Sequence, residues 1–413
     1  MYYTTKQIIN PELFHSNICY NESGEYMKEN KRLKIGLFID TFFPAIDGVV
    51  IAVDNLAKML AKNNDVTVIA PKTSTYKEDY KKPYEIIRIN SIHVPFTEYQ
   101  LGIKQNKIFK KLLNKKLDII HIHSPFTIGK IGVELAKKQN IPCVGTIHTR
   151  FEFEVERVIN NKTIINTFMK KVMKVYNNCD ECIAVNDPII EDIKKYGYKN
   201  KTTVILNGTD LTPIDPKDSN IERISKLYNL KKNDLVLIYV GRIISFKNIY
   251  FILDALKKLK DENIKFKMLY IGTGPDYQKL ENKIKHYNMD DCVILTGRIN
   301  ERSILASIYK RADLLLFPSL MDTSSLVRIE ASTQETPGLF IKNSMVGQTI
   351  DNNFNGYTSE YDIDCYKERI KEIISNKNKL KKVGKNAKET IGKSWKDIAE
   401  ETYNEYLKLI EKR

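Results

Sequence analysis

The strongest constraint on the fold of this chain is an alternation of short apolar runs with longer amphipathic segments, in two successive series. In the first series the apolar runs are KIGLFID (34–40), DVTVIA (65–70), LDIIHIH (117–123), IPCVGTIH (141–148), ECIAVND (181–187) and TTVILNG (202–208). In the second they are LVLIYVG (235–241), FKMLYIG (266–272), CVILTG (292–297) and ADLLLFPS (312–319). Helical patterns lie between them, for example over 49–62, 127–139 and 247–260. This alternation predicts parallel, doubly wound sheets, so we expect an α/β protein with two facing Rossmann-like domains.

The length of the chain fits the same division. At 413 residues it is too long for one ordinary core and suits two domains of about 150–200 residues each. We expect an N-terminal domain over 33–210 and a C-terminal domain over 211–393. Residues 1–32 are polar and lack clear periodicity, which predicts an extension outside the core. The segment 394–413 predicts a closing helix that packs back on the N-terminal domain.

The formal net charge of +15 raises the question of an anionic partner. The excess of basic residues is shared evenly, because residues 1–210 carry +8 and residues 211–413 carry +7. Neither half is therefore a dedicated basic domain. No recognisable nucleic-acid-reading module accompanies the lysines, so we expect no nucleic-acid partner.

The cysteines bear on the cellular compartment. All six are scattered, at positions 19, 143, 179, 182, 292 and 365, and no secretory signal is recognisable, which predicts reduced thiols in a cytoplasmic protein. Cys179 and Cys182 form a CxxC pair, but nothing nearby completes a zinc site, and we interpret the pair as buried where a helix joins a strand. No apolar run approaches the ~20 residues that cross a bilayer, so contact with the inner face of the cell membrane is expected to be peripheral.

The most informative stretch for function is FPSLMDTSSLVRIEASTQETP, at 317–337. Asp322 and Glu330 flank a predicted helix start, with Ser324 or Ser325 as the N-cap. The free amides and the positive dipole end of such a helix suit a diphosphate. Glu330, about a turn and a half into the helix, suits the two hydroxyls of a ribose. The alternative interpretation is two exposed acids at a helix start.

Two cations follow a strand in GRIISFKN, at 241–248. Together, Arg242 and Lys247 suit the two phosphates of a nucleotide sugar, where fixed cations stabilise the charge that grows on the leaving group. Two solvated surface cations are the alternative. The Gly272-Thr273-Gly274-Pro275 string after the next strand fits a tight turn as well as a phosphate contact, and no strand is followed by GxGxxG.

In combination, these stretches resemble a known family. The carrying motifs are PAIDGVV (44–50), HIHSPFTIG (121–129), GTIHTRFE (145–152), NGTD (207–210), VGRIISFKN (240–248), IGTGP (271–275) and 317–337. Their order and spacing resemble the family-4 retaining glycosyltransferases of GT-B fold, from about residue 33 to the C-terminus. The resemblance implies two facing Rossmann-like domains and a nucleotide-sugar donor.

The resemblance also implies roles for individual residues. His148 matches a family histidine beside the donor sugar, and Asp322 matches a family glutamate that holds sugar hydroxyls under the reacting carbon. Arg242 and Lys247 match a diphosphate clamp, and these four are the candidate catalytic residues. The candidate nucleotide-sugar-binding residues are Gly48, Arg242, Lys247, Arg298, Asp322, Ser324, Ser325, Leu326 and Glu330. At Gly48 the family backbone approaches the nucleotide phosphates, where a side chain would block the approach.

The chain departs from the family pattern at several of these positions. The usual glutamate at 322 is an aspartate, one methylene shorter, and the usual Gly-aromatic-Gly after it is Thr323-Ser324-Ser325. Glu335 stands where a glycine is common, and Gln348 where an acid is common. These departures bear on the identity of the donor sugar and on activity itself.

The implied mechanism retains the anomeric configuration. No pair of carboxylates is assigned as nucleophile and acid/base, unlike in retaining glycosidases. We expect front-face attack, in which the leaving phosphate oxygen takes the acceptor's proton. Arg242, Lys247 and the helix dipole replace a divalent cation, so we expect neither metal nor cofactor.

Two basic amphipathic segments bear on the acceptor. LGIKQNKIFKKLLNKK (101–116) carries six lysines and no acid, and KTIINTFMKKVMKVY (162–176) carries four. Such helices suit an anionic membrane surface, although core-packed helices with solvated lysines are the alternative. The candidate membrane and acceptor contacts are Lys104, Lys107, Lys110, Lys111, Lys170 and Lys171.

The similarity to diacylglycerol glucosyltransferases points to glucose from UDP-glucose as donor and to a membrane lipid such as diacylglycerol as acceptor. The same chemistry on a surface polysaccharide or a small acceptor is the alternative. A hypothesis of another class is a degenerate GT-B protein that binds or scaffolds a partner glycosyltransferase.

Overall fold

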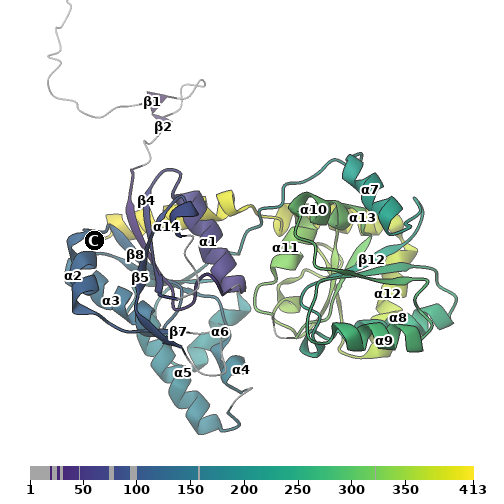
Figure 1. Cartoon of the computed structure of the whole chain (residues 1–413), viewed down its shortest axis with the longest axis horizontal. Helices are drawn as coiled ribbons and strands as arrows, with labels where there is room; N and C mark the ends of the chain where they lie inside the picture. The colour runs from purple at the N-terminus through teal and green to yellow at the C-terminus, as the bar shows by residue number, and fades with distance from the viewer. Residues whose placement is uncertain are drawn as a thin grey trace, which may run out of the picture.

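The computed structural model describes residues 19–20, 26–27, 31–45, 47–73, 79–93, 100–156, 159–320 and 322–413. Most of the segment predicted as an N-terminal extension lies outside these residues. The described residues from 31 onward form two lobes, each built on its own parallel sheet with helices on both faces (Figure 1). This is the doubly wound α/β architecture that the alternating pattern predicts.

The sheet of the first lobe has the strand order β11-β10-β9-β8-β3-β4-β5, and all of its neighbouring strands are parallel. Its strands are β3 (Lys34–Phe38), β4 (Asp65–Pro71), β5 (Glu85–Ile89), β8 (Ile119–Ile122), β9 (Cys143–Ile147), β10 (Glu181–Ala184) and β11 (Thr202–Val204). The order reverses between β3 and β8. In open sheets of this kind, ligands bind outside the carboxyl ends of the strands at such a reversal.

The sheet of the second lobe has the order β14-β13-β12-β15-β16-β17, again parallel, and reverses between β12 and β15. Its strands are β12 (Val236–Val240), β13 (Lys267–Ile271), β14 (Val293–Gly297), β15 (Leu314–Phe317), β16 (Gly338–Ile341) and β17 (Tyr357–Ser359).

Amphipathic helices cover both sheets. In the first lobe they are α1 (Gly48–Leu60), α2 (Asn106–Asn114), α3 (Thr127–Gln139), α4 (Phe151–Glu156), α5 (Lys162–Tyr176) and α6 (Pro188–Lys195). In the second they are α7 (Ser219–Leu227), α8 (Ile249–Asp261), α9 (Tyr277–His286), α10 (Arg302–Arg311), α11 (Leu326–Thr333), α12 (Ile363–Ser375) and α13 (Lys377–Thr390).

Helix α8 shows why these segments fold as they do. Its buried residues Ile249, Ile252, Leu253, Leu256 and Leu259 recur at helical spacing and pack into the core of the second lobe. Burying each of these side chains contributes roughly 1.5–3 kcal/mol.

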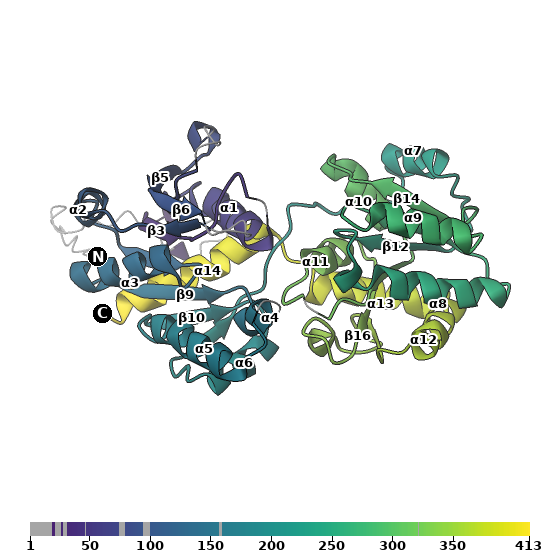
Figure 2. The same ribbon diagram turned by 60° about the horizontal axis from the view of Figure 1, so that its bottom comes forward.

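The last helix, α14 (Trp395–Glu411), returns to the first lobe and packs along α1 (Figure 2). A capping box at Ser394 and Asp397 begins it. The chain therefore crosses between the lobes twice, and the two crossings lie side by side. Thr209 donates its amide to the Lys393 carbonyl (2.9 Å), and Trp395 donates its amide to the Thr209 carbonyl (3.2 Å).

Two short pairs of strands lie outside the main sheets. β6 (Ser91–His93) pairs with β7 (Gln100–Gly102), and β1 (Cys19–Tyr20) pairs with β2 (Tyr26–Met27), both antiparallel. Among the described residues, no helix is long and apolar enough to span a membrane.

The CxxC cysteines Cys179 and Cys182 are buried next to the start of β10, as predicted. The Cys179 Sγ lies 3.8 Å from the Cys143 Sγ, and all three cysteines are free thiols. Over the described ranges, no three His, Cys, Asp or Glu side chains are grouped to hold a metal ion.

Candidate functional site

The carboxyl ends of strands from both sheets meet between the lobes. Helix α11 lies on the side of the second lobe that faces the first in both views (Figures 1 and 2). The loop before α11 contacts the first lobe directly. The Thr323 hydroxyl donates a hydrogen bond to the His148 carbonyl (2.8 Å), and the Asn207 amide donates one to the Ser324 hydroxyl (3.2 Å). The Asn186 amide donates one to the Thr323 carbonyl.

The loop after β12 carries Arg242 and Lys247 and is packed tightly against the loop after β13. A Cβ at Gly272 would lie 1.9 Å from the Gly241 carbonyl oxygen, and one at Gly274 would lie 2.2 Å from that of Ile243. Gly272 also has a φ of +144°, which side chains rarely adopt. The glycines of the 271–275 string are thus required by a close approach of two backbones, which supports the tight-turn interpretation of that string.

Lys247 forms an ion pair with Asp322. Its Nζ lies 2.6 and 2.7 Å from the two carboxylate oxygens, and both side chains are about one-fifth exposed. Burial, and then the negative charge of Asp322, raise the pKa of Tyr239, whose hydroxyl donates to the Arg242 carbonyl (3.0 Å). Arg242 itself is exposed, and its guanidinium has no hydrogen bond or ion pair with another described residue. Of the two cations of the predicted clamp, Lys247 is therefore already paired with a carboxylate, whereas Arg242 is not.

Helix α11 begins as the sequence predicts, with Ser325 as the N-cap and Leu326 as the first helical residue. The Ser325 hydroxyl accepts from the Arg328 amide (3.3 Å), so the cap satisfies only one of the free amides of the first turn. Arg298 follows β14 in the same sheet, where it is exposed.

Glu330 is buried in the body of α11, with both carboxylate oxygens occupied. Arg302 Nη2 donates to Oε1 (2.7 Å), and the Tyr309 hydroxyl donates to Oε2 (2.8 Å). Burial raises the pKa of Glu330, and Arg302 opposes this rise. Arg302 also pairs with Asp210, in the segment that joins the lobes. Glu330 is thus neither an exposed acid nor a free one, and a ribose hydroxyl would join an existing network.

Gly48 is the first residue of α1, behind the N-cap Asp47, whose carboxylate accepts from the Val50 amide (2.8 Å). A Cβ at Gly48 would meet no protein atom within 4 Å. Packing within the protein therefore does not require glycine at this position, and its backbone is exposed.

His148 follows β9 and belongs to a row of three histidines. Its Nε2 lies 3.0 Å from the Nδ1 of His123, and the two rings are stacked. His121, beside His123, bonds to the Tyr406 hydroxyl and the Thr146 hydroxyl, each at 2.6 Å. Burial lowers the pKa of His148 to about 4 and that of His121 to about 3, and it also lowers the pKa of His123. All three imidazoles are neutral at pH 7.

The structure shows the backbone conformation or the side-chain partners of two residues that depart from the family pattern, Glu335 and Gln348. Glu335 has a φ of +64°, a left-handed conformation that favours glycine. Its carboxylate pairs with Lys310 (3.0 Å) and Lys388 (2.8 Å). Gln348 is exposed, and its side-chain amide donates to the Asn343 carbonyl (3.2 Å).

The two basic segments form helices whose apolar faces pack into the first lobe. Phe109 and Leu112 of α2 are buried, whereas Ile103 before it and Ile164 of α5 are exposed. Lys104 pairs with Glu134. The remaining candidate membrane lysines are exposed, namely Lys107, Lys110, Lys111, Lys170 and Lys171.

Several residues at this site were given no role from the sequence. Arg302 and Tyr309, which bind Glu330, lie on α10, more than twenty positions before it in the chain. Asn186 and Asn207 each follow a strand, and that position was the signal that could have identified them.

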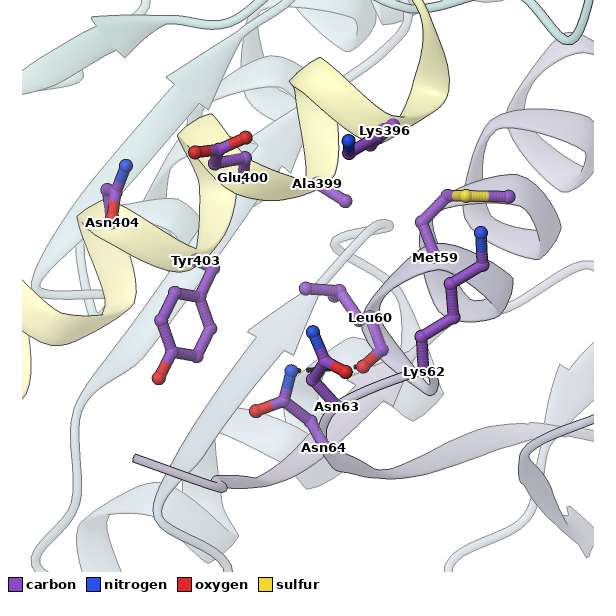
Figure 3. A pocket seen from close by; sticks show the side chains of 10 residues that line it. All are labelled: Met59, Leu60, Lys62, Asn63, Asn64, Lys396, Ala399, Glu400, Tyr403 and Asn404. Atoms are coloured by element: carbon purple, nitrogen blue, oxygen red, sulfur yellow. Dashed lines mark hydrogen bonds between the residues drawn. The ribbon is translucent and has the colours of Figure 1, made fainter. Parts of the chain in front are cut away.

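A separate pocket of about 400 Å³ lies between the far end of α1 and α14 (Figure 3). Its lining is mixed, with Leu60, Asn64, Lys396, Glu400 and Tyr403 among its residues. Because α1 has 13 residues at about 1.5 Å each, this pocket lies roughly 20 Å from Gly48. It is therefore not part of the site between the lobes.

Two protein-family models match the chain. The model described as Glycosyltransferase Family 4 matches residues 46–213, and the one described as Glycosyl transferases group 1 matches residues 220–390. Together they include every strand of the second sheet and every strand of the first except β3.

Two relatives are alpha-monoglucosyldiacylglycerol synthases. The protein of Streptococcus pneumoniae is 28% identical over 341 residues, which cover 80% of this chain and 76% of its own. The protein of Acholeplasma laidlawii is 27% identical over 398 residues, which cover 92% of this chain and 98% of its own.

Solved structures share the fold at lower identity. HepE of Anabaena in complex with UDP has a TM-score of 0.74 at 16% identity, covering 91% of this chain and 100% of that one. Sucrose-phosphate synthase from Thermosynechococcus elongatus has a TM-score of 0.70 at 21% identity, covering 92% and 100%. At these identities the likeness establishes the arrangement of two Rossmann-like domains.

Proposed function

Because the chain belongs to the family-4, group-1 glycosyltransferases of GT-B fold, we propose that it transfers a hexose, glucose from UDP-glucose, to the hydroxyl of a membrane lipid such as diacylglycerol. The observation that carries this proposal is the convergence, where the lobes meet, of the Lys247–Asp322 ion pair and the N-terminus of α11, with the buried carboxylate of Glu330 further along the same helix. The two synthase relatives support glucose as the sugar and diacylglycerol as the acceptor, and one of them aligns over 92% of the chain.

The proposed donor site uses groups from both sheets. The exposed Arg242 and the Lys247 ammonium contact the diphosphate, and the free amides of Ser325 and Leu326 add the positive end of the α11 dipole. Glu330 accepts the ribose hydroxyls while Arg302 and Tyr309 hold its carboxylate in place. The exposed backbone at Gly48 admits the phosphates from the opposite lobe, and Arg298 lines the nucleotide end.

The proposed mechanism stabilises the leaving group without a metal ion. Negative charge grows on the phosphate oxygens as the glycosidic bond breaks, and Arg242 and Lys247 stabilise it more in the transition state than in the ground state. A diphosphate that engages Lys247 competes with Asp322 for the ammonium. Asp322 is then released to bind sugar hydroxyls. The neutral His148 lies beside the sugar and can donate or accept a hydrogen bond without adding charge.

The acceptor hydroxyl attacks from the face that the phosphate leaves. Its proton passes to the departing phosphate oxygen, so the configuration at the anomeric carbon is retained. The exposed lysines of α2 and α5 support approach to a lipid, because each lysine near an anionic surface contributes about 1 kcal/mol to binding. We propose that the protein acts peripherally at the inner face of the cell membrane.

A panel of nucleotide sugars, each offered with diacylglycerol vesicles, a polysaccharide and small alcohols, tests this proposal. We expect UDP-glucose with diacylglycerol to yield an α-linked glucolipid, identified by mass spectrometry and by the anomeric coupling in NMR spectra. Product only with a soluble acceptor would move the assignment to a polysaccharide or small acceptor. If no nucleotide sugar is hydrolysed or transferred, the protein is a degenerate GT-B partner of another enzyme.

A further inference from the structure

Three neighbouring strand ends of the first lobe converge on two residues of the second. The strands β11, β10 and β9 are adjacent in the sheet, and Asn207, Asn186 and His148 follow them respectively. Each of these residues makes one hydrogen bond to Thr323 or Ser324, in the loop before α11. The two lobes are therefore joined at the carboxyl edge of three strands, directly beside the proposed donor site.

Two of the three hydrogen bonds depend on side chains that the loop itself supplies. The Thr323 hydroxyl donates to the His148 carbonyl, and the Ser324 hydroxyl accepts from Asn207. With glycine at both positions, only the bond from Asn186 to the Thr323 carbonyl would remain. The segment Thr323-Ser324 thus makes contacts that a flexible, glycine-rich loop cannot make.

The groups that receive this loop are held in place by the first lobe. Asn186 is 1% exposed, and its side-chain oxygen accepts from the Ile189 amide at the start of α6 (3.0 Å). Asn207 is 9% exposed. The His148 partner atom is a backbone carbonyl at the end of a buried strand. These partner groups are already ordered, so each hydrogen bond to the loop costs little side-chain entropy and stabilises the contact between the lobes more than a bond to a mobile side chain would.

We propose that Thr323 is a positioning residue: its hydroxyl, with that of Ser324, holds the two lobes closed before the donor binds. The inference rests on the proposed function, because the loop so held carries Asp322 and leads to the α11 amides assigned to the donor. Thr323 thereby fixes Asp322, from one lobe, in relation to His148, from the other. Nucleotide binding to an already closed protein requires no further energy for closure.

Small-angle scattering tests the closed state without any need for activity. We expect the wild type to have the same radius of gyration with and without UDP. The double variant Thr323→Val/Ser324→Ala should have a larger radius alone and the wild-type radius with saturating UDP. Thr333→Val is the matched control, because it removes a hydroxyl of α11 whose hydrogen bond among the described residues stays within that helix, to the Ile329 carbonyl. An unchanged radius in the folded double variant overturns the proposal.

Kinetics and UDP titration distinguish positioning from direct sugar contact. Loss of one neutral hydrogen bond corresponds to about a fivefold change in an equilibrium constant. We expect Thr323→Val to raise the donor KM and the UDP Kd by the same factor, at most about fivefold, because both ligands need the closed state. The value of kcat at saturating donor should stay within about twofold, and Thr323→Ser should restore KM and Kd.

Two other outcomes contradict the proposal, and a third concerns only the proposed function. A raised donor KM with unchanged UDP Kd would make Thr323 a sugar contact. A lowered melting temperature with unchanged KM and Kd would leave it a purely structural residue. If the wild type binds no UDP, the proposed function fails, whereas the scattering comparison of wild type and double variant still decides the closure.

Discussion

Lys247 and Asp322 form an ion pair in the structure, so a donor would have to displace Asp322 before Lys247 could bind its phosphates. The ammonium contacts both carboxylate oxygens, at 2.6 and 2.7 Å, while Arg242 remains exposed. In the proposed mechanism, an arriving diphosphate meets Arg242 first and then competes with Asp322 for Lys247. The proposed sugar and phosphate sites would thereby be coupled through one lysine.

Replacing Arg242 or Lys247 by Ala should lower kcat by about 100-fold or more, by analogy with the loss of one oxyanion-hole donor. UDP affinity should change less, because leaving-group charge is largest in the transition state. Steady-state rates and UDP calorimetry measure the two effects. A variant that loses UDP affinity but keeps kcat would limit that cation to ground-state binding.

Glu330→Ala should weaken UDP binding by roughly 2–4 kcal/mol, since two charge-assisted hydrogen bonds to the ribose are lost. Because Glu330 also binds Arg302 and Tyr309, the control is Glu330→Gln, which keeps the size and one acceptor. Calorimetry should rank wild type above Gln above Ala. Equal affinities for all three would remove Glu330 from the nucleotide site.

The buried histidines predict an acid-sensitive fold. The pKa of His121 is lowered to about 3 by burial, whereas an unfolded histidine titrates near 6.5. The unfolded chain therefore takes up a proton below pH 6.5 that the folded protein refuses. The stability that the neutral ring contributes is complete above pH 6.5 and is lost progressively as the pH falls toward 3.

Urea unfolding at pH 6.5 and pH 5 checks this prediction by comparison with His121→Gln, which is polar but does not titrate. The wild type should lose about 1.6 kcal/mol more than the variant over this interval, because the unfolded histidine is half protonated at pH 6.5 and the slope approaches about 1.4 kcal/mol per pH unit only below that pH. Equal losses in the two proteins would mean that the folded protein protonates His121 in this range.

Most of the candidate catalytic residues that could be predicted from the sequence are charged residues that follow a predicted strand. Asp322, Arg242 and Lys247 were identifiable in this way, and the structure brings Asp322 and Lys247 into contact. The partners of Glu330 were not identifiable, because Arg302 and Tyr309 reach it from another helix and only the packing of α10 against α11 brings them there.

At the scale of elements, two of the strands that sequence patterns miss lie at a sheet edge. β5 is an edge strand that includes Glu85 and Arg88, so it lacks a continuous apolar run. β17 is the other edge strand and has only three residues, whereas the missed β16 is a buried interior strand as long as β8 and β10, so neither its length nor its place explains the omission. The central strands are buried on both faces, and their unbroken apolar runs made them predictable.

Helix α2 carries the membrane prediction. Reversing Lys107, Lys110 and Lys111 to Glu should abolish salt-sensitive sedimentation with anionic vesicles, while UDP binding in the other lobe persists. Lys115 is left in place because it pairs with Glu85. The folded state should tolerate the change, since all three lysines are exposed and none forms a hydrogen bond or ion pair with another described residue; Lys111 acts only at longer range, where its charge helps to lower the pKa of Glu85.

The matched control reverses three exposed lysines of α13 in the second lobe, Lys379, Lys381 and Lys382. It changes the net charge equally and should leave vesicle binding in place. Equal loss in both variants would indicate general charge attraction. A wild type that ignores anionic vesicles at low salt would favour a soluble acceptor.

At the scale of the molecule, the two lobes are tied together at separate places. The crossings at Thr209 and Lys393 lie side by side, α14 packs on α1, and Thr323 and Ser324 reach the first sheet beside the donor site. The repeated α/β pattern predicted two domains. It did not predict how they face each other, because the cross-lobe bonds depend on residues without a pattern of their own.

The central claim is that the proposed site between the lobes transfers a sugar from a nucleotide to a lipid without a metal ion. The most direct measurement is the initial rate of UDP release from UDP-glucose, with and without diacylglycerol vesicles, in EDTA. We expect release that rises with diacylglycerol and is the same whether or not EDTA is present. Release that stops in EDTA and returns with Mg²⁺ or Mn²⁺, or that diacylglycerol does not increase, would contradict it.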